Sequence, residues 1–125
     1  MADALFGDYN PGGRLPVTFY KSVNDLPPFT DYRMANRTYR YFTGDPLYPF
    51  GFGLSYTTFA YTNLKVSATT FKDVDGVSIS VDVTNTGSMT GKEIVQVYVH
   101  DLRSKLMRPF KELKGFTKVE LLPGE

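Results

Sequence analysis

The alternation of apolar and polar side chains over residues 77–84, which read VSISVDVT, limits the possible fold of this chain more than any other feature. Side chains of an extended strand point alternately to its two faces, so apolar β-branched residues at every second position favour a strand over a helix. We expect an apolar face in a core, formed by Val77, Ile79, Val81 and Val83, and a solvent-facing set formed by Ser78, Ser80 and Thr84.

Three further segments after residue 60 are also predicted to form strands. Residues 64–68 alternate apolar with polar side chains, residues 93–99 carry valine at positions 95, 97 and 99, and residues 111–119 are a fourth candidate strand with a less regular pattern. Turn formers separate these segments, namely DVDG at residues 73–76 and the stretch from 85 to 91. Short strands at this spacing are typical of an antiparallel β-sandwich.

Residues 47–59, LYPFGFGLSYTTF, gather large apolar side chains around Gly51 and Gly53. Pro49 blocks a helix at the start of this run. In water the run would expose a large apolar patch. We therefore expect it to lie in a crevice between two bodies of protein.

The first twenty residues have the features of a helix end, a loop and a strand. ADALF at residues 2–6 is helix-forming, and Gly7 suits a C-terminal helix stop. This segment is either the last turn of a longer helix or an ordinary frayed terminus, and composition leaves both open. Residues 15–19, LPVTF, are expected to form a short strand with Pro16 at its first position or on a sheet edge.

Residues 21–41 have no sustained period of 2 or 3.6, and the pair Pro27-Pro28 favours an extended path. Residues 37–42, RTYRYF, interleave two arginines with three aromatics. We expect an extended segment with aromatic rings packed inward, rather than a surface for stacking nucleic-acid bases. Asn36-Arg37-Thr38 fits the N-glycosylation acceptor pattern, which short sequences often match by chance.

Three blocks of this sequence resemble glycoside hydrolase family 3, the β-glucosidases and β-xylosidases. GDYNPGGRLPVTF at residues 7–19 resembles the close of the family's α/β sandwich domain. YRYF at 39–42 and PFGFGLSY at 49–56 resemble its interdomain linker. The third block is similar to the fibronectin type III-like module, and it comprises VTNTG at 83–87, GKEIVQVYV at 91–99, RPFKELKGF at 108–116 and LPGE at 122–125.

This resemblance implies a mostly β fold, an incomplete immunoglobulin or fibronectin type III-like β-sandwich. It assigns residues 1–20 to the end of the α/β sandwich domain, residues 21–59 to the interdomain linker, and residues 60–125 to a partial, C-terminally truncated fibronectin type III-like domain. A complete seven-stranded sandwich takes ~100 residues. We therefore expect marginal stability, with exposed strand edges that promote self-association.

The resemblance also implies a parent enzyme that hydrolyses terminal β-glucosides or β-xylosides without a cofactor. In the family, the nucleophilic aspartate lies in the N-terminal barrel and the acid/base glutamate lies earlier in the α/β sandwich domain, and neither motif occurs in this sequence. No catalytic, cofactor-binding or metal residue is therefore assigned. We expect the chain to be inactive by itself and to act as a brace, with the rest of the glycosidase as its partner.

Composition narrows the remaining possibilities. The formal net charge of +1 gives no reason to expect nucleic acid or an anionic membrane as a partner. The sequence has no cysteine and one histidine, which argues against a disulfide framework and a structural zinc site. No apolar run approaches the ~20 residues that span a bilayer. The compartment cannot be read from the sequence, although the family is compatible with a secreted or periplasmic parent.

Two alternatives of other classes are considered. An independent carbohydrate-binding or adhesion module would expose Tyr39, Tyr41 and Tyr48 for sugar stacking, whereas burial of these rings would favour the brace. A polyanion-binding domain would use the basic residues that follow the third predicted strand, but a solvated strand face and loop explain them more simply. These residues are Arg103, Lys105, Arg108, Lys111, Lys114 and Lys118. His100 and Ser104 lie four residues apart without a nucleophile-elbow motif.

Overall fold

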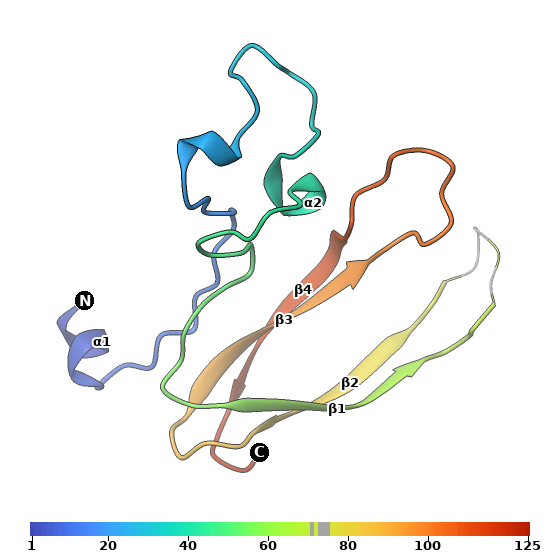
Figure 1. Cartoon of the computed structure of the whole chain (residues 1–125). Coiled ribbons are helices and arrows are strands. Elements are labelled where there is room, and N and C mark those ends of the chain that lie inside the picture. Colours follow the sequence, from blue (N-terminus) through green and yellow to red (C-terminus); the bar gives the residue numbers. More distant parts are fainter. Residues whose placement is uncertain (71, 73–75) are drawn as a thin grey trace. The chain divides into compact units, whose positions relative to one another are not determined.

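The computed structural model describes residues 1–70, 72 and 76–125, and these residues form a mostly β fold (Figure 1). The predicted turn at 73–76 falls largely outside the described residues. The helical elements are α1 (Ala2–Phe6), the 3₁₀ turn η1 (Val23–Asp25) and α2 (Thr38–Tyr41). The strands are β1 (Phe59–Val66), β2 (Ile79–Asn85), β3 (Gly91–Val99) and β4 (Glu112–Leu121).

The four strands predicted after residue 60 are confirmed. They form two two-stranded sheets, in which β1 pairs with β2 and β3 pairs with β4 (Figure 1). The strand predicted at 64–68 is longer and begins earlier, at Phe59. The alternating run predicted at 77–84 becomes β2, which extends to Asn85. The local period of two therefore identified β1, β2 and β3, while strand pairing set the ends.

The β1–β2 hairpin contains a bulge. Phe59 pairs with Asn85 and Val66 with Ile79, but the register shifts between Thr62 and Lys65, where β1 has one residue more than β2. An extra residue in one strand bends it and needs an unusual backbone conformation. Asn63 occupies this position with φ 53°, and its side-chain amide donates to Asp82 Oδ2 at 2.8 Å.

The predicted apolar core around β2 is wrong in one important respect. Ile79 is 46% exposed, and its polar neighbours Ser78 and Ser80 are exposed as well, whereas Val81 and Val83 are half-buried. Among the described residues no aliphatic or aromatic side chain other than that of Pro109 is buried. Ile79 lies at the far end of a strand that pairs with β1 alone, and one-sided burial requires a second layer over the whole strand.

The segment predicted as a strand at 15–19 does not form one. Phe19 and Tyr48 make an isolated antiparallel bridge, with reciprocal N–H···O contacts of 2.9 and 3.2 Å. Leu15 N–H donates to Phe52 O and Leu15 O accepts from Gly51 N–H, both at 2.8 Å. The partner segment turns at residues 49–52, where Gly51 has φ 82° and Phe52 N–H donates to Pro49 O at 3.1 Å, so the pairing does not continue as a strand.

The predictions for residues 2–6 and for residues 37–42 had different outcomes. The helix turn at residues 2–6 is confirmed as α1, which ends at Gly7 with φ 89°. The extended path expected at 37–42 is wrong, because residues 38–41 form one helical turn. The turn is closed by Phe42 N–H donating to Thr38 O at 2.9 Å, and Thr38 N–H donates to the Tyr20 hydroxyl at 2.7 Å.

The chain divides into two compact units, each assembled from separate segments. Unit 1 comprises residues 1–11, 55–93 and 120–125, and unit 2 comprises residues 12–54 and 94–119. The predicted division at residues 20 and 59 is not tested by this and stays a prediction. Within the described residues, no helix is long and apolar enough to cross a membrane.

Candidate functional site

Unit 1 is organised around the side chain of Asn85, the last residue of β2, which is fully buried. Its Nδ2 donates to Met89 O at 2.8 Å and to Leu121 O at 3.0 Å. Its Oδ1 accepts from Thr57 Oγ1 at 2.6 Å and from the Gly87 N–H at 3.1 Å. Every hydrogen-bonding position of the amide is used, as burial of a polar group requires.

The backbone of Asn85 joins the same unit to the last residues of the sequence. Its N–H donates to Glu125 O and its carbonyl accepts from Gly124 N–H, both at 2.9 Å. Asn85 therefore connects three segments of unit 1: the end of the apolar run 47–59 through Thr57, the turn after β2, and the turn after β4.

Asn10 makes a second junction in unit 1, and it is also buried. Its Nδ2 donates to Thr90 O at 3.0 Å, while its Oδ1 accepts from Ser55 Oγ and from Tyr56 N–H, both at 2.9 Å. The N-terminal segment is thus attached to the end of the apolar run 47–59 and to the turn before β3. Because these contacts span up to 80 positions, they need the complete unit.

A glycine explains how Thr57 comes so close to its neighbours. A Cβ at Gly91 would lie 2.5 Å from Thr57 Cγ2 and 2.8 Å from Asn10 Nδ2. Only glycine leaves room for the two polar junctions to pack together. The arrangement provides rigid attachment between segments and has no nucleophile or proton donor positioned for chemistry.

Unit 2 is organised around Tyr39 of α2. Its ring stacks on Phe50 with centroids 4.2 Å apart and meets the edge of Tyr98 at 6.0 Å. Its hydroxyl accepts from Leu113 N–H at 3.1 Å. Burial raises the pKa of Tyr39, but the Leu113 hydrogen bond and the Arg40 guanidinium together outweigh this, so the pKa lies below its usual value.

Further contacts connect α2 to the residues just before β4, and these residues to β3. Phe110 N–H donates to the carbonyl of Arg40 at 2.8 Å, and Lys111 Nζ lies 5.0 Å from the centre of the Tyr98 ring. Gly51 packs against this surface, since a Cβ there would lie 2.5 Å from Gln96 Oε1. In unit 2 residues 39–51 are therefore attached to the β3–β4 hairpin by aromatic stacking and backbone hydrogen bonds.

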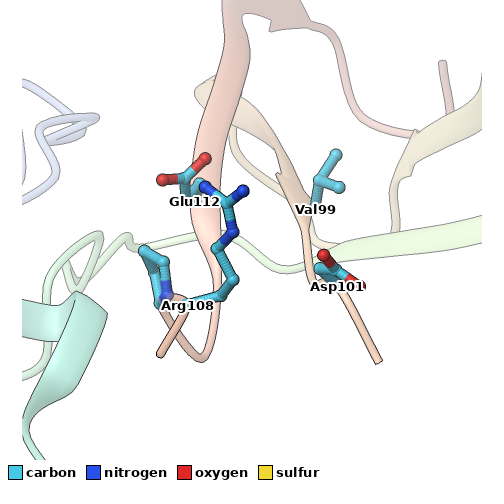
Figure 2. Close-up of a pocket in the computed structure, with 5 residues that line it drawn as sticks. Val99, Asp101, Arg108 and Glu112 are labelled. Carbon is cyan, nitrogen blue, oxygen red and sulfur yellow. The ribbon is translucent and has the colours of Figure 1, made fainter. Parts of the chain in front are cut away.

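A pocket of about 170 Å³ lies at the loop end of this hairpin, where β3 ends and β4 begins, and Figure 2 shows its lining. Arg108 extends toward Glu112 of β4, and Asp101 and Val99 lie on the other side. A glycosidase acid needs a raised pKa. The hydrogen bond from Lys114 instead lowers the pKa of Glu112, so its carboxylate stays ionised and does not suit that role.

Asp101 has a local structural role in the same loop. Its Oδ1 accepts from Arg103 N–H at 3.1 Å, and Ser104 Oγ accepts from Leu106 N–H at 3.1 Å. Each of these two hydrogen bonds closes a local turn within the loop. His100 is exposed. Within the part of the chain that the structure describes, no cluster of three or more His, Cys, Asp or Glu side chains could hold a metal ion.

The three tyrosines that discriminate a brace from a sugar-binding module give a mixed result. Tyr39 and Tyr41 are half-buried, and the Tyr39 ring face is used by Phe50. Tyr48 is 43% exposed but contacts Phe52 and Phe19 with centroid distances of 5.1 and 6.3 Å. These rings mainly pack on each other. All six basic residues that follow β3 are exposed, with Lys111 over Tyr98 and Lys114 paired to Glu112.

Sequence reasoning placed Asn10 and Asn85 in turns and missed their central role. The signal available was weak, because asparagine is common wherever a chain turns. Nothing local in Thr57 distinguishes it from other threonines. Their contacts depend on partners 28 to 80 positions away, so only the folded chain reveals them.

Two family models match this chain. Residues 1–56 match the glycosyl hydrolase family 3 C-terminal domain, and residues 93–125 match the fibronectin type III-like domain. The whole chain is 44% identical to a periplasmic beta-glucosidase of Salmonella typhimurium and 49% identical to a xylan 1,4-beta-xylosidase of Xylanibacter ruminicola. The chain belongs to glycoside hydrolase family 3.

The family 3 assignment extends to solved structures. Beta-glucosidase 3B from Thermotoga neapolitana is 40% identical and superimposes with a TM-score of 0.87 over 99% of this chain. The chain spans 19% of that structure, and 18% and 14% of the Salmonella and Xylanibacter enzymes. It thus corresponds to a C-terminal part of family 3 glycosidases, including the β-sandwich strands, and to less than a fifth of their length.

Proposed function

We propose that this chain is the non-catalytic, structural C-terminal part of a family 3 glycosidase that hydrolyses terminal β-glucosides or β-xylosides. The observation that carries the proposal is full-length similarity, at 44% and 49% identity, to a β-glucosidase and a β-xylosidase of which the chain covers 18% and 14%. The contacts of Asn10, Thr57 and Asn85 support a bracing role, because they tie separate segments together with buried side-chain amides.

The direct test is an activity assay on the 125-residue chain. Incubation with aryl β-glucoside and aryl β-xyloside, with phenol release followed by absorbance, is expected to give no turnover above a matched blank. An intact family 3 enzyme serves as the positive control. Turnover that persists through repurification and follows the protein peak would contradict the proposal.

A graft tests the bracing role. In beta-glucosidase 3B from Thermotoga neapolitana, the matched segment is replaced by this chain. The chimera is expected to retain glucosidase activity, while the same chimera with Asn85→Ala is expected to melt at a lower temperature. Asn24→Ala, at an exposed position, is the matched control. Equal melting temperatures for all three chimeras would remove Asn85 from the brace.

We further propose the division into residues 1–20, 21–59 and 60–125 as the end of the α/β domain, the linker and a partial sandwich domain. We also propose that the isolated chain self-associates through its strand edges. Exposed apolar side chains on the hairpins support this second proposal, among them Leu64, Val66 and Ile79 in unit 1 and Phe116 in unit 2. Unpaired edges beside such side chains favour pairing with another chain.

A further inference from the structure

Asn36-Arg37-Thr38 is the one N-x-Ser/Thr acceptor sequence in this chain, and the fold engages both ends of the Asn36 amide. Nδ2 donates to the carbonyl of Asp25 at 3.2 Å. Oδ1 accepts from Thr43 N–H at 3.2 Å and from Thr43 Oγ1 at 3.3 Å. The side chain is half-buried and joins η1 to the residues after α2, all within unit 2.

Thr38, the hydroxyl residue of the acceptor sequence, is also held in place. Both Asn36 and Thr38 have φ 56°, a left-handed conformation that a β-branched residue rarely adopts. Thr38 N–H donates to the Tyr20 hydroxyl at 2.7 Å, and its Oγ1 accepts from Arg40 N–H at 3.3 Å. The acceptor sequence therefore adopts a constrained backbone conformation, and its Thr38 hydroxyl is hydrogen-bonded to the backbone of α2.

N-glycosylation requires the opposite arrangement. Asn Nδ2 attacks the anomeric carbon of an activated sugar, the bond from that carbon to the phosphate leaving group breaks, and Nδ2 loses a proton. A transferase must hold the amide and the hydroxyl of the acceptor together in its own site, free of other partners. In this fold the amide and the hydroxyl already have intramolecular partners, and two residues have a constrained backbone.

We propose that Asn36 is a modification site controlled by folding: a nucleotide-sugar transferase can modify it while residues 20–43 are unfolded, and the folded unit 2 withholds it. The contacts that withhold it are those of Asn36 with Asp25 and Thr43, and that of Thr38 with Tyr20. The proposal concerns this sequence alone and does not rest on the glycosidase function.

The test compares acceptors of one sequence in different states. A soluble N-glucosyltransferase is incubated with UDP-glucose and either a synthetic peptide of residues 28–44 or the 125-residue chain, and addition of one glucose is followed by intact mass. The peptide is expected to react at least tenfold faster than the folded chain. Tyr20→Phe, which removes the acceptor for Thr38 N–H, is expected to raise the rate for the chain.

The matched control is Tyr32→Phe, because the Tyr32 side chain is 87% exposed and the change removes the same hydroxyl group. It is expected to leave the rate for the chain unchanged. A folded chain that reacts as fast as the peptide would overturn the proposal. Equal rates for Tyr20→Phe and the unmodified chain would overturn the assigned mechanism of withholding.

Discussion

At the scale of single residues, a few polar side chains carry an unusual share of the organisation of this chain. In unit 1 the buried side chains among the described residues are polar, and Asn85 is the most deeply buried of them. In unit 2 strain is concentrated at Asn36 and Thr38. Substitutions at these positions should therefore have larger effects than substitutions of the exposed apolar residues.

Replacing Asn85 by alanine should lower the free energy of unfolding by about 3 kcal/mol, because it leaves the carbonyls of Met89 and Leu121 and the hydroxyl of Thr57 without their partner. Urea unfolding followed by tyrosine fluorescence measures the change. The exposed Asn24→Ala should shift stability by less than about 0.5 kcal/mol. Equal midpoints for the two variants would refute the assigned role.

Replacing Thr38 by glycine should stabilise the chain by about 1 kcal/mol. A non-glycine residue at φ 56° costs roughly 1–3 kcal/mol, and part of that relief is offset by the extra freedom of glycine in the unfolded chain. Thermal melting measures the effect. Thr62→Gly in β1, where φ is not positive, is the control and should destabilise. A lower melting temperature for Thr38→Gly would show that the conformation is not strained.

The carboxylate of Asp31 should titrate unusually low. Arg33 Nη2 donates to Asp31 Oδ2 at 2.7 Å and its Nε to Oδ1 at 3.0 Å, and these bonds lower the pKa of Asp31 from 3.8 to about 2. Because the folded pKa is the lower one, the stabilisation is present above pH 3.8 and is lost as pH falls through about 2.

A carboxyl NMR titration measures this pKa directly. Arg33→Gln should move the Asp31 midpoint back toward 3.8, while Lys118→Gln, at an exposed position in β4, should leave it in place. An Asp31 midpoint that does not respond to Arg33→Gln would show that the pair does not form in solution.

At the scale of elements, short segments are fixed by what they contact more than by their own propensity. A four-residue helix such as α2 is unstable by itself, because nucleation costs more than one turn returns. It is attached to β4 through the Tyr39 hydroxyl, and to Phe110 just before β4 through the Arg40 carbonyl. The strand predicted at 15–19 fails for the converse reason, since its partner segment turns at Gly51, which has φ 82°, instead of continuing as a strand.

Tyr39→Phe tests the attachment of α2 to β4. It should cost about 1 kcal/mol, because the ring can still stack on Phe50 while the Leu113 N–H loses its acceptor. Hydrogen exchange at the Leu113 amide should become faster. Tyr32→Phe is the control for a tyrosine hydroxyl at the surface. Unchanged exchange at Leu113 would contradict the contact.

At the scale of the whole chain, the two hairpins expose more apolar surface than a closed domain would. Ile79, Leu64 and Phe116 are 46%, 70% and 73% exposed. A two-stranded hairpin is marginally stable in water, and at least three strands or a covering layer are needed for independent stability. The proposed self-association follows from this balance.

Light scattering across a dilution series measures the expected association. The mean mass should rise with concentration, and the melting temperature should rise with it, since binding a second copy stabilises the folded state. Adding Ile79→Lys and Leu64→Lys, which place charge beside the β1–β2 edges, should lower the mass at each concentration. A monodisperse monomer with a sharp, concentration-independent melt would show that the chain closes its own core.

The sequence by itself determined the strands, the helix stop at Gly7 and the family. These features depend on local pattern: β2 follows from side chains at a period of two, and α1 ends where a glycine adopts a left-handed conformation. The family is carried by runs such as RPFKELKGF, which need no knowledge of the fold.

Tertiary structure alone decided which side chains are buried and which segments are joined. Asn85 looks like an ordinary turn residue, and it is central because Thr57 and Leu121, 28 and 36 positions away, converge on it. Ile79 has the pattern of a core residue and is 46% exposed, because a period of two fixes the face of a strand and not whether anything covers it. Burial depends on the layer that packs on that face, which is a property of the folded protein and not of the strand.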